Sequence, residues 1–251
     1  ISGKMRNIFK ICLLFFIGLA LTGNTYGKSL YWDHINSDIY ILPDSSVRVQ
    51  EELGYVFDGA WNGGYREIDT TKLDGVSDIE VWEGPIRYRE NRRLNLHEFS
   101  VADQGNKTMI KWRSRDPNDA PYQQTAKTFI TKYTVQGLPT YHKKYDEIYW
   151  KAIFEDRSGV VSQVKVRVHF PTKVNAEDLR INLFTGITGA TWQVVNPYVV
   201  EFSGNNLEPY QLFEIKLDFP KGIVTPVLSL KHFLRRYVPL PTLFMIPLLT
   251  L

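Results

Sequence analysis

The sequence predicts an all-β fold, an antiparallel β-sandwich, and three observations lead to this prediction. Apolar residues recur with a period of two through the middle of the chain, as they do in half-buried strands. Turn residues separate the apolar segments at intervals of roughly 8–12 residues. The sequence has no convincing amphipathic helix, and 14% of its residues are aromatic. About ten strands over ~200 residues fit either one large sandwich or two stacked halves.

The clearest strand is predicted at residues 160–170. There Val164, Val166 and Val168 alternate with polar or charged residues, and Pro171 ends the run. Such alternation is typical of an antiparallel strand with one face on a core and the other in water.

A strand, a tight turn and a second strand are predicted over residues 38–57, with the turn at residues 43–46. We expect at most one helical turn, at residues 175–179. The remaining strands are expected at residues 78–82, 108–113, 128–135, 145–154, 198–203 and 211–219.

The N-terminal segment has the pattern of a secretory signal peptide, predicted over residues 1–27. Arg6 and Lys10 precede an uncharged apolar run at residues 11–21, and Thr25 and Gly27 are small residues before a cleavage point. The apolar run is shorter than the roughly 20 residues that span a bilayer. A retained anchor is the alternative. Both interpretations place the middle of the chain on the extracytoplasmic side of the cell membrane.

The sole cysteine, Cys12, lies inside the predicted signal peptide. After cleavage the protein would have no cysteine, which excludes disulfides, thiol catalysis and cysteine-ligated zinc. Its stability must then come from the core of a domain predicted at residues 28–225. A domain of ~200 residues is large enough for that.

The C-terminal end is predicted to be a linker, residues 226–236, followed by the start of a transmembrane helix, residues 237–251. The latter segment carries no charge and is apolar to its last residue, although three prolines interrupt it. A proline-rich tail that packs on the domain is the alternative.

The positive net charge of the chain comes from its two ends. The whole sequence has 30 basic and 27 acidic side chains, but residues 28–225 contain 24 basic and 27 acidic ones. The predicted domain is therefore slightly acidic, so its composition does not indicate a nucleic-acid partner.

Several segments of the chain, taken in order, resemble the exported N-terminal region of the YciQ-like predicted membrane proteins, domain of unknown function 2207. They lie at residues 44–51, 57–59, 65–68, 128–135, 146–150, 160–171, 207–209 and 219–224. The resemblance covers about residues 33–225. It implies a β-rich domain followed by transmembrane helices, and it carries no catalytic residues with it.

A glycine-rich stretch at residues 58–67 is the first candidate contact surface. Its glycines permit a loop from which Trp61, Tyr65 and Arg66 could contact a sugar face or a carboxylate. The alternative is a long hairpin in which Trp61 closes one end of the core and Arg66 pairs with an acid.

A basic cluster at residues 87–93 is the second candidate. Arg87 and Arg89, with Trp82 nearby in the sequence, could meet anionic lipid or a wall polymer. The alternative is a charged hairpin tip in solvent.

The sequence predicts no cofactor and no metal site. The five histidines lack metal-ligand spacing, and no phosphate-binding glycine motif or nucleophile elbow occurs. Asp116 and Asp119 could ligate calcium from a proline-bounded loop, but the regular spacing of a calcium loop is missing and a solvated turn is the alternative.

We therefore expect a membrane-anchored domain for protein interaction or assembly at the cell envelope, and not an enzyme. One alternative is a carbohydrate-binding module that stacks sugars on Trp61, Trp82 or Trp192. The other is a glycan hydrolase with a carboxylate pair across a cleft. Exposed, coplanar tryptophans would favour the first alternative, and two facing carboxylates the second.

Overall fold

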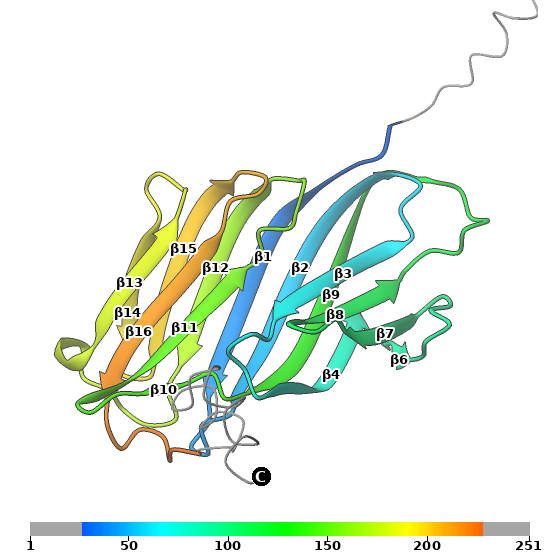
Figure 1. The fold of residues 1–251 in the computed structure, drawn as a ribbon. Helices are drawn as coiled ribbons and strands as arrows, with labels where there is room; N and C mark the ends of the chain where they lie inside the picture. Colours follow the sequence, from blue (N-terminus) through cyan, green and yellow to red (C-terminus); the bar gives the residue numbers. More distant parts are fainter. Residues whose placement is uncertain (1–26, 228–251) are drawn as a thin grey trace, which may run out of the picture.

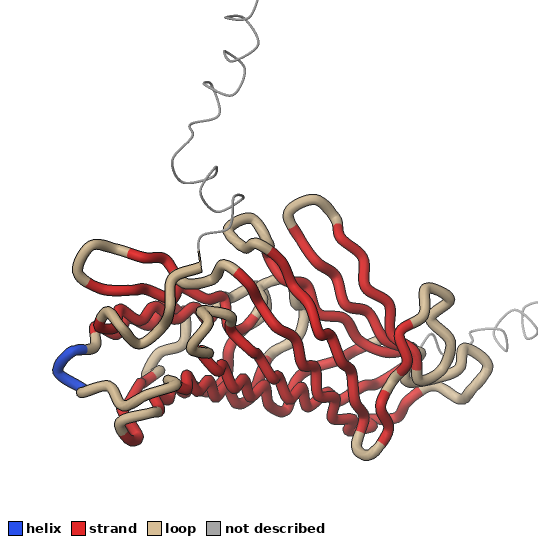
Figure 2. Tube along the Cα trace, turned by 90° about the horizontal axis from the view of Figure 1, so that it is seen from below, coloured by secondary structure: helices blue, strands red, loops and turns tan. Residues whose placement is uncertain are grey.

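The computed structural model describes residues 27–227. All but the last residue of the predicted signal peptide, the whole predicted transmembrane segment and all but two residues of the predicted linker lie outside this range. Within it the chain consists mainly of strands, with one helical turn, η1 (Ala176–Asp178), at one side of the molecule (Figure 2). The all-β class and the single helical turn are confirmed. No helix within residues 27–227 has the length and apolar character that a membrane crossing needs.

One sheet of eight strands runs across the whole molecule (Figure 1). In spatial order its strands are β14 (Thr191–Asn196), β15 (Val199–Leu207), β12 (Val161–His169), β1 (Ser29–Ile41), β2 (Val47–Gly59), β9 (Tyr122–Gln136), β4 (Gly75–Glu83) and β5 (Ile86–Arg87).

The centre of this sheet is not antiparallel. β1 and β2 form the predicted hairpin, but β12 pairs with the other edge of β1 in parallel, with Trp32 opposite Val161 and Tyr40 opposite His169. A parallel pair needs a long crossover, and here residues 42–160 supply it. β6 (Arg89–Glu90) and β7 (Glu98–Asp103) are also parallel. The prediction of antiparallel pairing is therefore correct for the other strand pairs and wrong for these two.

Two four-stranded sheets lie side by side against one face of the large sheet (Figure 1). One has the order β10 (Thr140–Tyr141), β11 (Tyr145–Ile153), β16 (Phe213–Pro220) and β13 (Arg180–Thr185). The other has the order β3 (Gly63–Asp69), β8 (Lys107–Arg113), β7 (Glu98–Asp103) and β6 (Arg89–Glu90).

Aromatic contacts connect each small sheet to the large one. Phe170, at the end of β12, lies 5.6 Å from Phe219 of β16 between ring centroids. Trp112 of β8 lies 5.4 Å from Phe129 of β9 and 6.3 Å from Tyr55 of β2. The architecture thus combines both predicted arrangements, because one layer is continuous and the opposite layer is divided.

The strand pattern of the sequence agrees with the burial in most of the sheet. On β12, Val164, Val166 and Val168 are buried, while Lys165 is exposed on the other face. Seven strands lie outside the predicted ranges, namely β3, β5, β6, β7, β10, β13 and β14. On β14 five of the six residues are exposed, so no apolar alternation marks that strand in the sequence.

The last described residues return to the turn between β1 and β2. The amide of Thr225 donates to the carbonyl oxygen of Pro43 at 2.8 Å, and the amide of Val227 lies 3.4 Å from the hydroxyl of Tyr141. The chain therefore leaves the described region beside β10. β1 begins at the opposite end of the large sheet, about 40 Å away for a strand of 13 residues.

Replacing Gly63 by alanine should destabilise the protein by about 1–3 kcal/mol. A Cβ at this position would lie 2.0 Å from the main-chain oxygen of Trp112, so β3 and β8 would have to move apart. At Gly75 the nearest atom to a Cβ is 3.6 Å away, and Gly75→Ala should change stability by less than about 0.5 kcal/mol. Urea unfolding of both variants tests this, and equal stability would contradict it.

Candidate functional site

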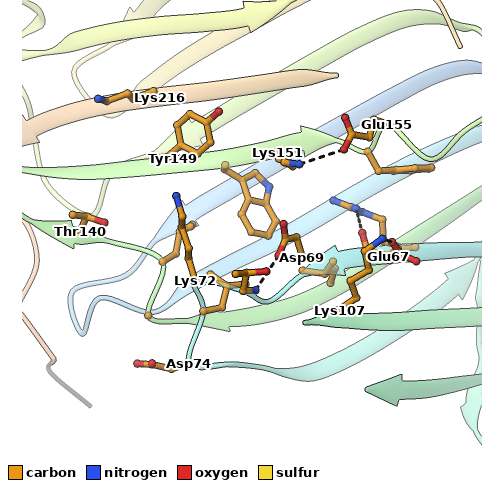
Figure 3. A pocket seen from close by; sticks show the side chains of 18 of the residues that line it. Glu67, Asp69, Lys72, Asp74, Lys107, Thr140, Tyr149, Lys151, Glu155 and Lys216 are labelled. Carbon is orange, nitrogen blue, oxygen red and sulfur yellow. Dashed lines mark hydrogen bonds and ion pairs between the residues drawn. The ribbon is translucent and has the colours of Figure 1, made fainter. Parts of the chain in front are cut away.

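A groove of about 900 Å³ lies between the two small sheets and is the candidate functional site (Figure 3). β11 forms one wall. The other wall is formed by β3, the segment after it, residues 71–74, and the segment that leads from β9 to β10. The site exists because the layer opposite the large sheet is divided.

The floor of the groove is apolar and its rim is aromatic. Leu73, Leu138 and Trp150 are buried and line the floor, whereas Tyr149 and Phe184 are exposed on the rim. The hydroxyl of Tyr149 donates to Glu214, and this bond, together with partial burial, raises the pKa of Tyr149 to about 12. Tyr149 is therefore neutral and held in place at physiological pH.

Lysine–carboxylate pairs cover the walls. Lys107 binds Glu67, Lys151 lies 3.4 Å from Glu155, and the third pair joins Lys216 of β16 to Glu147 of β11 at 3.1 Å. The carboxylate partners raise the pKa of Lys107 and of Lys216. Lys107 and Lys216 therefore stay charged, and each of the three lysines already has a carboxylate partner in the protein.

Lys72 is the exception among the lysines of the groove. It lies on the segment between β3 and β4, is exposed, and points into the groove (Figure 3). None of the described residues forms an ion pair or hydrogen bond with its ammonium group. Lys72 therefore leaves one positive charge in the groove for a ligand.

A buried ion pair lies beneath the β3 wall. The Nε atom of Arg66 donates to both carboxylate oxygens of Glu51, each at 2.9 Å, and both residues are almost fully buried. Glu51 also accepts hydrogen bonds from Tyr133 at 2.9 Å and Thr131 at 3.2 Å. Burial lowers the pKa of Arg66, but the charges and hydrogen bonds of Glu51 and Tyr133 together outweigh burial, and the pKa is raised overall.

The structure therefore places Arg66 in the core, paired with Glu51, and not on a loop surface. Its side chain points between the layers because alternate residues of β3 face the core, and Glu51 on β2 is its partner there. The alternative drawn from the sequence, an arginine paired with an acid, describes what is found.

The other two residues predicted in the glycine-rich stretch also have structural partners. Trp61 is half-buried, and its indole nitrogen donates to the carbonyl oxygen of Ser29 at 2.8 Å. Tyr65 is partly exposed, and its hydroxyl donates to the carbonyl oxygen of Asp156 at 2.8 Å. The latter contact joins β3 to Asp156, which lines the groove.

The second predicted cluster lies away from the groove. Trp82 on β4 is half-buried, and the guanidinium of Arg87 lies 5.7 Å from the centroid of its ring. Arg87 also pairs with Glu80 at 2.7 Å, and Arg89 on β6 pairs with Glu98. Of the three tryptophans considered for sugar stacking, only Trp192 is exposed.

No cluster of potential metal ligands occurs among residues 27–227. In the loop predicted as the calcium alternative, the Asp116 carboxylate accepts the amide of Asn118 at 3.0 Å, and Asp119 accepts the amide of Asp116 at 3.1 Å. Both carboxylates therefore stabilise their own turn.

The family described as "Predicted membrane protein (DUF2207) N-terminal domain" matches residues 32–219. The chain belongs to this family. The resemblance noted in the sequence is thereby confirmed, and with it the description as a domain of a predicted membrane protein. No curated protein matches the chain.

Solved structures share only a weak likeness with this DUF2207 domain. A putative protease from Parabacteroides distasonis is 8% identical over 76% of this chain and 40% of its own, with a TM-score of 0.44. Native leukotriene A4 hydrolase from Saccharomyces cerevisiae is 9% identical over 79% and 31%, with a TM-score of 0.42. The M1 zinc metallopeptidase from Deinococcus radiodurans is 9% identical over 76% and 42%, with a TM-score of 0.35. The DUF2207 chain thus spans less than half of each of these proteins, and such a likeness says nothing about function.

The sequence analysis missed Lys72, Tyr149 and Lys151 as site residues. For two of them a signal was present, because Tyr149 and Lys151 stand on the polar face of the strand predicted at residues 145–154. Lys72 lies in a turn without a motif. Nothing in the sequence indicates that these residues share one groove.

Replacing Arg66 by methionine should cost about 3–5 kcal/mol of unfolding free energy, because the Glu51 carboxylate would remain buried without its partner. The double variant Glu51→Leu/Arg66→Met should lose much less, since no charge is left in the core. Arg48 is exposed, and Arg48→Met serves as the control, with a change within about 0.5 kcal/mol. Urea unfolding measures all three; an equal loss in the single and double variants would contradict the argument.

Glu98 should make the DUF2207 domain sensitive to acid. Hydrogen bonds from Arg89, from the amide of Asn95 and from Asn91 lower the pKa of Glu98 from 4.5 to about 2. A lowered pKa in the folded state means that the stabilisation is complete above pH 4.5 and is lost as the pH falls toward 2. In Glu98→Gln the unfolding free energy should therefore fall less steeply across this range. Parallel curves for the two proteins would show that Glu98 does not contribute.

Proposed function

We propose that this DUF2207 domain is a protein-interaction domain of a membrane protein, held on the extracytoplasmic side of the cell membrane, and that its groove binds a partner polypeptide. The observation that carries the proposal is the pair of strand edges beside the groove. Neither β3 nor β11 pairs with a strand across the groove, apart from the two residues of β10. Open strand edges are sites at which another chain can pair.

The chemistry of the groove also supports a polypeptide ligand. An apolar floor beside exposed aromatic residues, Tyr149 and Phe184, matches the composition of protein-binding surfaces. Sugar stacking has less support, because Trp61 and Trp82 are half-buried and only Trp192 is open.

A hydrolase also has less support. Glycoside hydrolysis requires two carboxylates that face each other across the bond to be cleaved. Glu67 and Asp156 do approach each other in the groove, but both bind the ammonium of Lys107, which occupies the space between them. The other two lysine pairs of the walls neutralise Glu155 and Glu147 in the same way.

The location rests on the signal pattern at residues 1–27 and on the family's description as a predicted membrane protein. The described chain ends at Val227 beside Tyr141 of β10, next to one end of the groove. A membrane anchor that follows residue 227 would hold that end of the groove near the bilayer. Partners in the same membrane or in the adjacent envelope are then within reach.

Photo-crosslinking in the native host tests the proposal on the full-length protein. p-Benzoylphenylalanine replaces Tyr149 on the groove rim, and in a control it replaces Tyr31, an exposed tyrosine at the start of β1. We expect adducts from position 149 that proteases digest and glycosidases do not, and none from position 31. Adducts that glycosidases remove, or equal adducts from both positions, would overturn the proposal, as would the absence of any adduct from position 149.

A further inference from the structure

We propose that the partner enters the groove as one extended strand, which pairs with the free edge of β11 in line with β10 and places a carboxylate near Lys72. This inference rests on the proposed function and adds the binding mode and the class of ligand. Strand addition of this kind uses main-chain hydrogen bonds for affinity and side chains for selectivity.

The main chain of β11 is oriented for such pairing. The amide of His142 donates to the carbonyl oxygen of Tyr145 at 3.0 Å, so residue 145 faces β10. Alternate residues of an antiparallel strand present both their N–H and C=O groups to the same edge. Glu147, opposite Thr140 of β10, is the next residue to do so. Tyr149 and Lys151 therefore present their main-chain groups to the groove, beyond the end of β10.

β10 begins only at Thr140 and does not extend alongside Tyr149 of β11, and the reason is local. Pro139 precedes its first residue, and a proline cannot donate to a strand ladder. Gly137 then has a φ of 76°, which turns the chain back toward β9, and Leu138 between them is buried. The strand position alongside Tyr149 and Lys151 is consequently left open by the described chain.

β3 is a poorer edge than β11. The carbonyl oxygen of Asn62 accepts the amide of Ser114 at 2.8 Å, so Tyr65 and Glu67 present their main-chain groups to the groove. However, the guanidinium of Arg66 already donates to the carbonyl oxygen of Glu67. The side chain of Tyr65 meanwhile connects β3 to the carbonyl oxygen of Asp156, at a residue that lines the groove. The buried ion pair thus leaves β11 as the edge for a ligand.

One polar group in the groove indicates what a ligand must offer. The ammonium of Lys72 has no counter-ion among the described residues, so a carboxylate from the ligand fits there. The buried side chains of Leu73, Leu138 and Trp150 form the apolar floor of the groove. We infer an acidic, extended peptide with apolar side chains toward the floor.

A peptide selection tests the inference with the full chain in nanodiscs. The probe is a phage-displayed library of random nonapeptides, which are about 30 Å long when extended. We expect recovered peptides to be enriched in Asp and Glu at one position. Recovery no better than on empty nanodiscs, or no acidic enrichment, would overturn the inference.

Variants of β11 separate main-chain pairing from side-chain contact. Lys151→Pro removes the amide that faces the groove and leaves the ladder with β16, whereas Lys151→Ala removes only the side chain. Recovered peptides should bind Lys151→Pro at least tenfold more weakly than Lys151→Ala. Equal binding to both variants would exclude pairing with β11.

N-methylation of the peptide gives a second measurement that does not depend on the folding of Lys151→Pro. Methyl groups on alternate peptide amides should abolish binding, while those on the intervening amides should be tolerated. A uniform effect along the peptide would overturn strand addition.

Charge reversal tests the role of Lys72. Lys72→Glu should weaken binding of an acidic peptide at least tenfold, and exchange of the peptide acid for lysine should restore it. Lys111 is exposed on β8 and provides the matched control, Lys111→Glu, with binding unchanged. If the lysine-containing peptide does not regain binding to Lys72→Glu, then Lys72 is not part of the binding site.

The outcomes of these experiments distinguish the proposed function, protein interaction, from the proposed binding mode, strand addition. Polypeptide adducts at position 149 combined with equal binding to Lys151→Pro and Lys151→Ala would leave a protein-interaction domain without strand addition. The absence of polypeptide adducts would remove the proposed function itself.

Discussion

The buried ion pair between Glu51 and Arg66 is the interaction on which the arrangement around the groove depends. It joins β2 in the continuous sheet to β3 in one half of the divided layer, and hydrogen bonds from Tyr133 and Thr131 on β9 hold it from below. A buried charge pair tolerates little displacement, because loss of either partner leaves an unpaired charge in the core. β3 is therefore held at a set position over the large sheet, and one wall of the groove with it.

Because of the same ion pair, the two walls of the groove differ in the main-chain hydrogen-bonding groups that they offer. Arg66 satisfies the main-chain carbonyl of Glu67 on the groove edge of β3, so that edge has less hydrogen-bonding capacity to offer. On β11, no described side chain forms a comparable hydrogen bond with the main chain beyond the end of β10. Natural sheets usually block or cover their edges, and the proposed strand addition rests on this free edge above an apolar floor.

Much of the fold could be predicted from the residues alone. The hairpin of β1 and β2 and the alternation on β12 follow from the preference of apolar side chains for one face of a strand. The parallel pairing of β1 with β12 could not be predicted, since alternation does not record which strand lies next to which. Half-exposed strands such as β14 were missed because they bury too little to produce a pattern.

The all-β class, the more strongly alternating strands and membership of the DUF2207 family could be predicted from the sequence, because each depends on local order along the chain. The signal peptide at residues 1–27 stays a prediction. Tertiary structure alone decided that Arg66 is buried, that Trp82 and Arg87 lie away from the groove, and that Lys72, Tyr149 and Lys151 lie together. The physical reason is that a groove between two sheets is made by strands that are distant in the chain. Their residues come together only when the large sheet sets where each small sheet can pack.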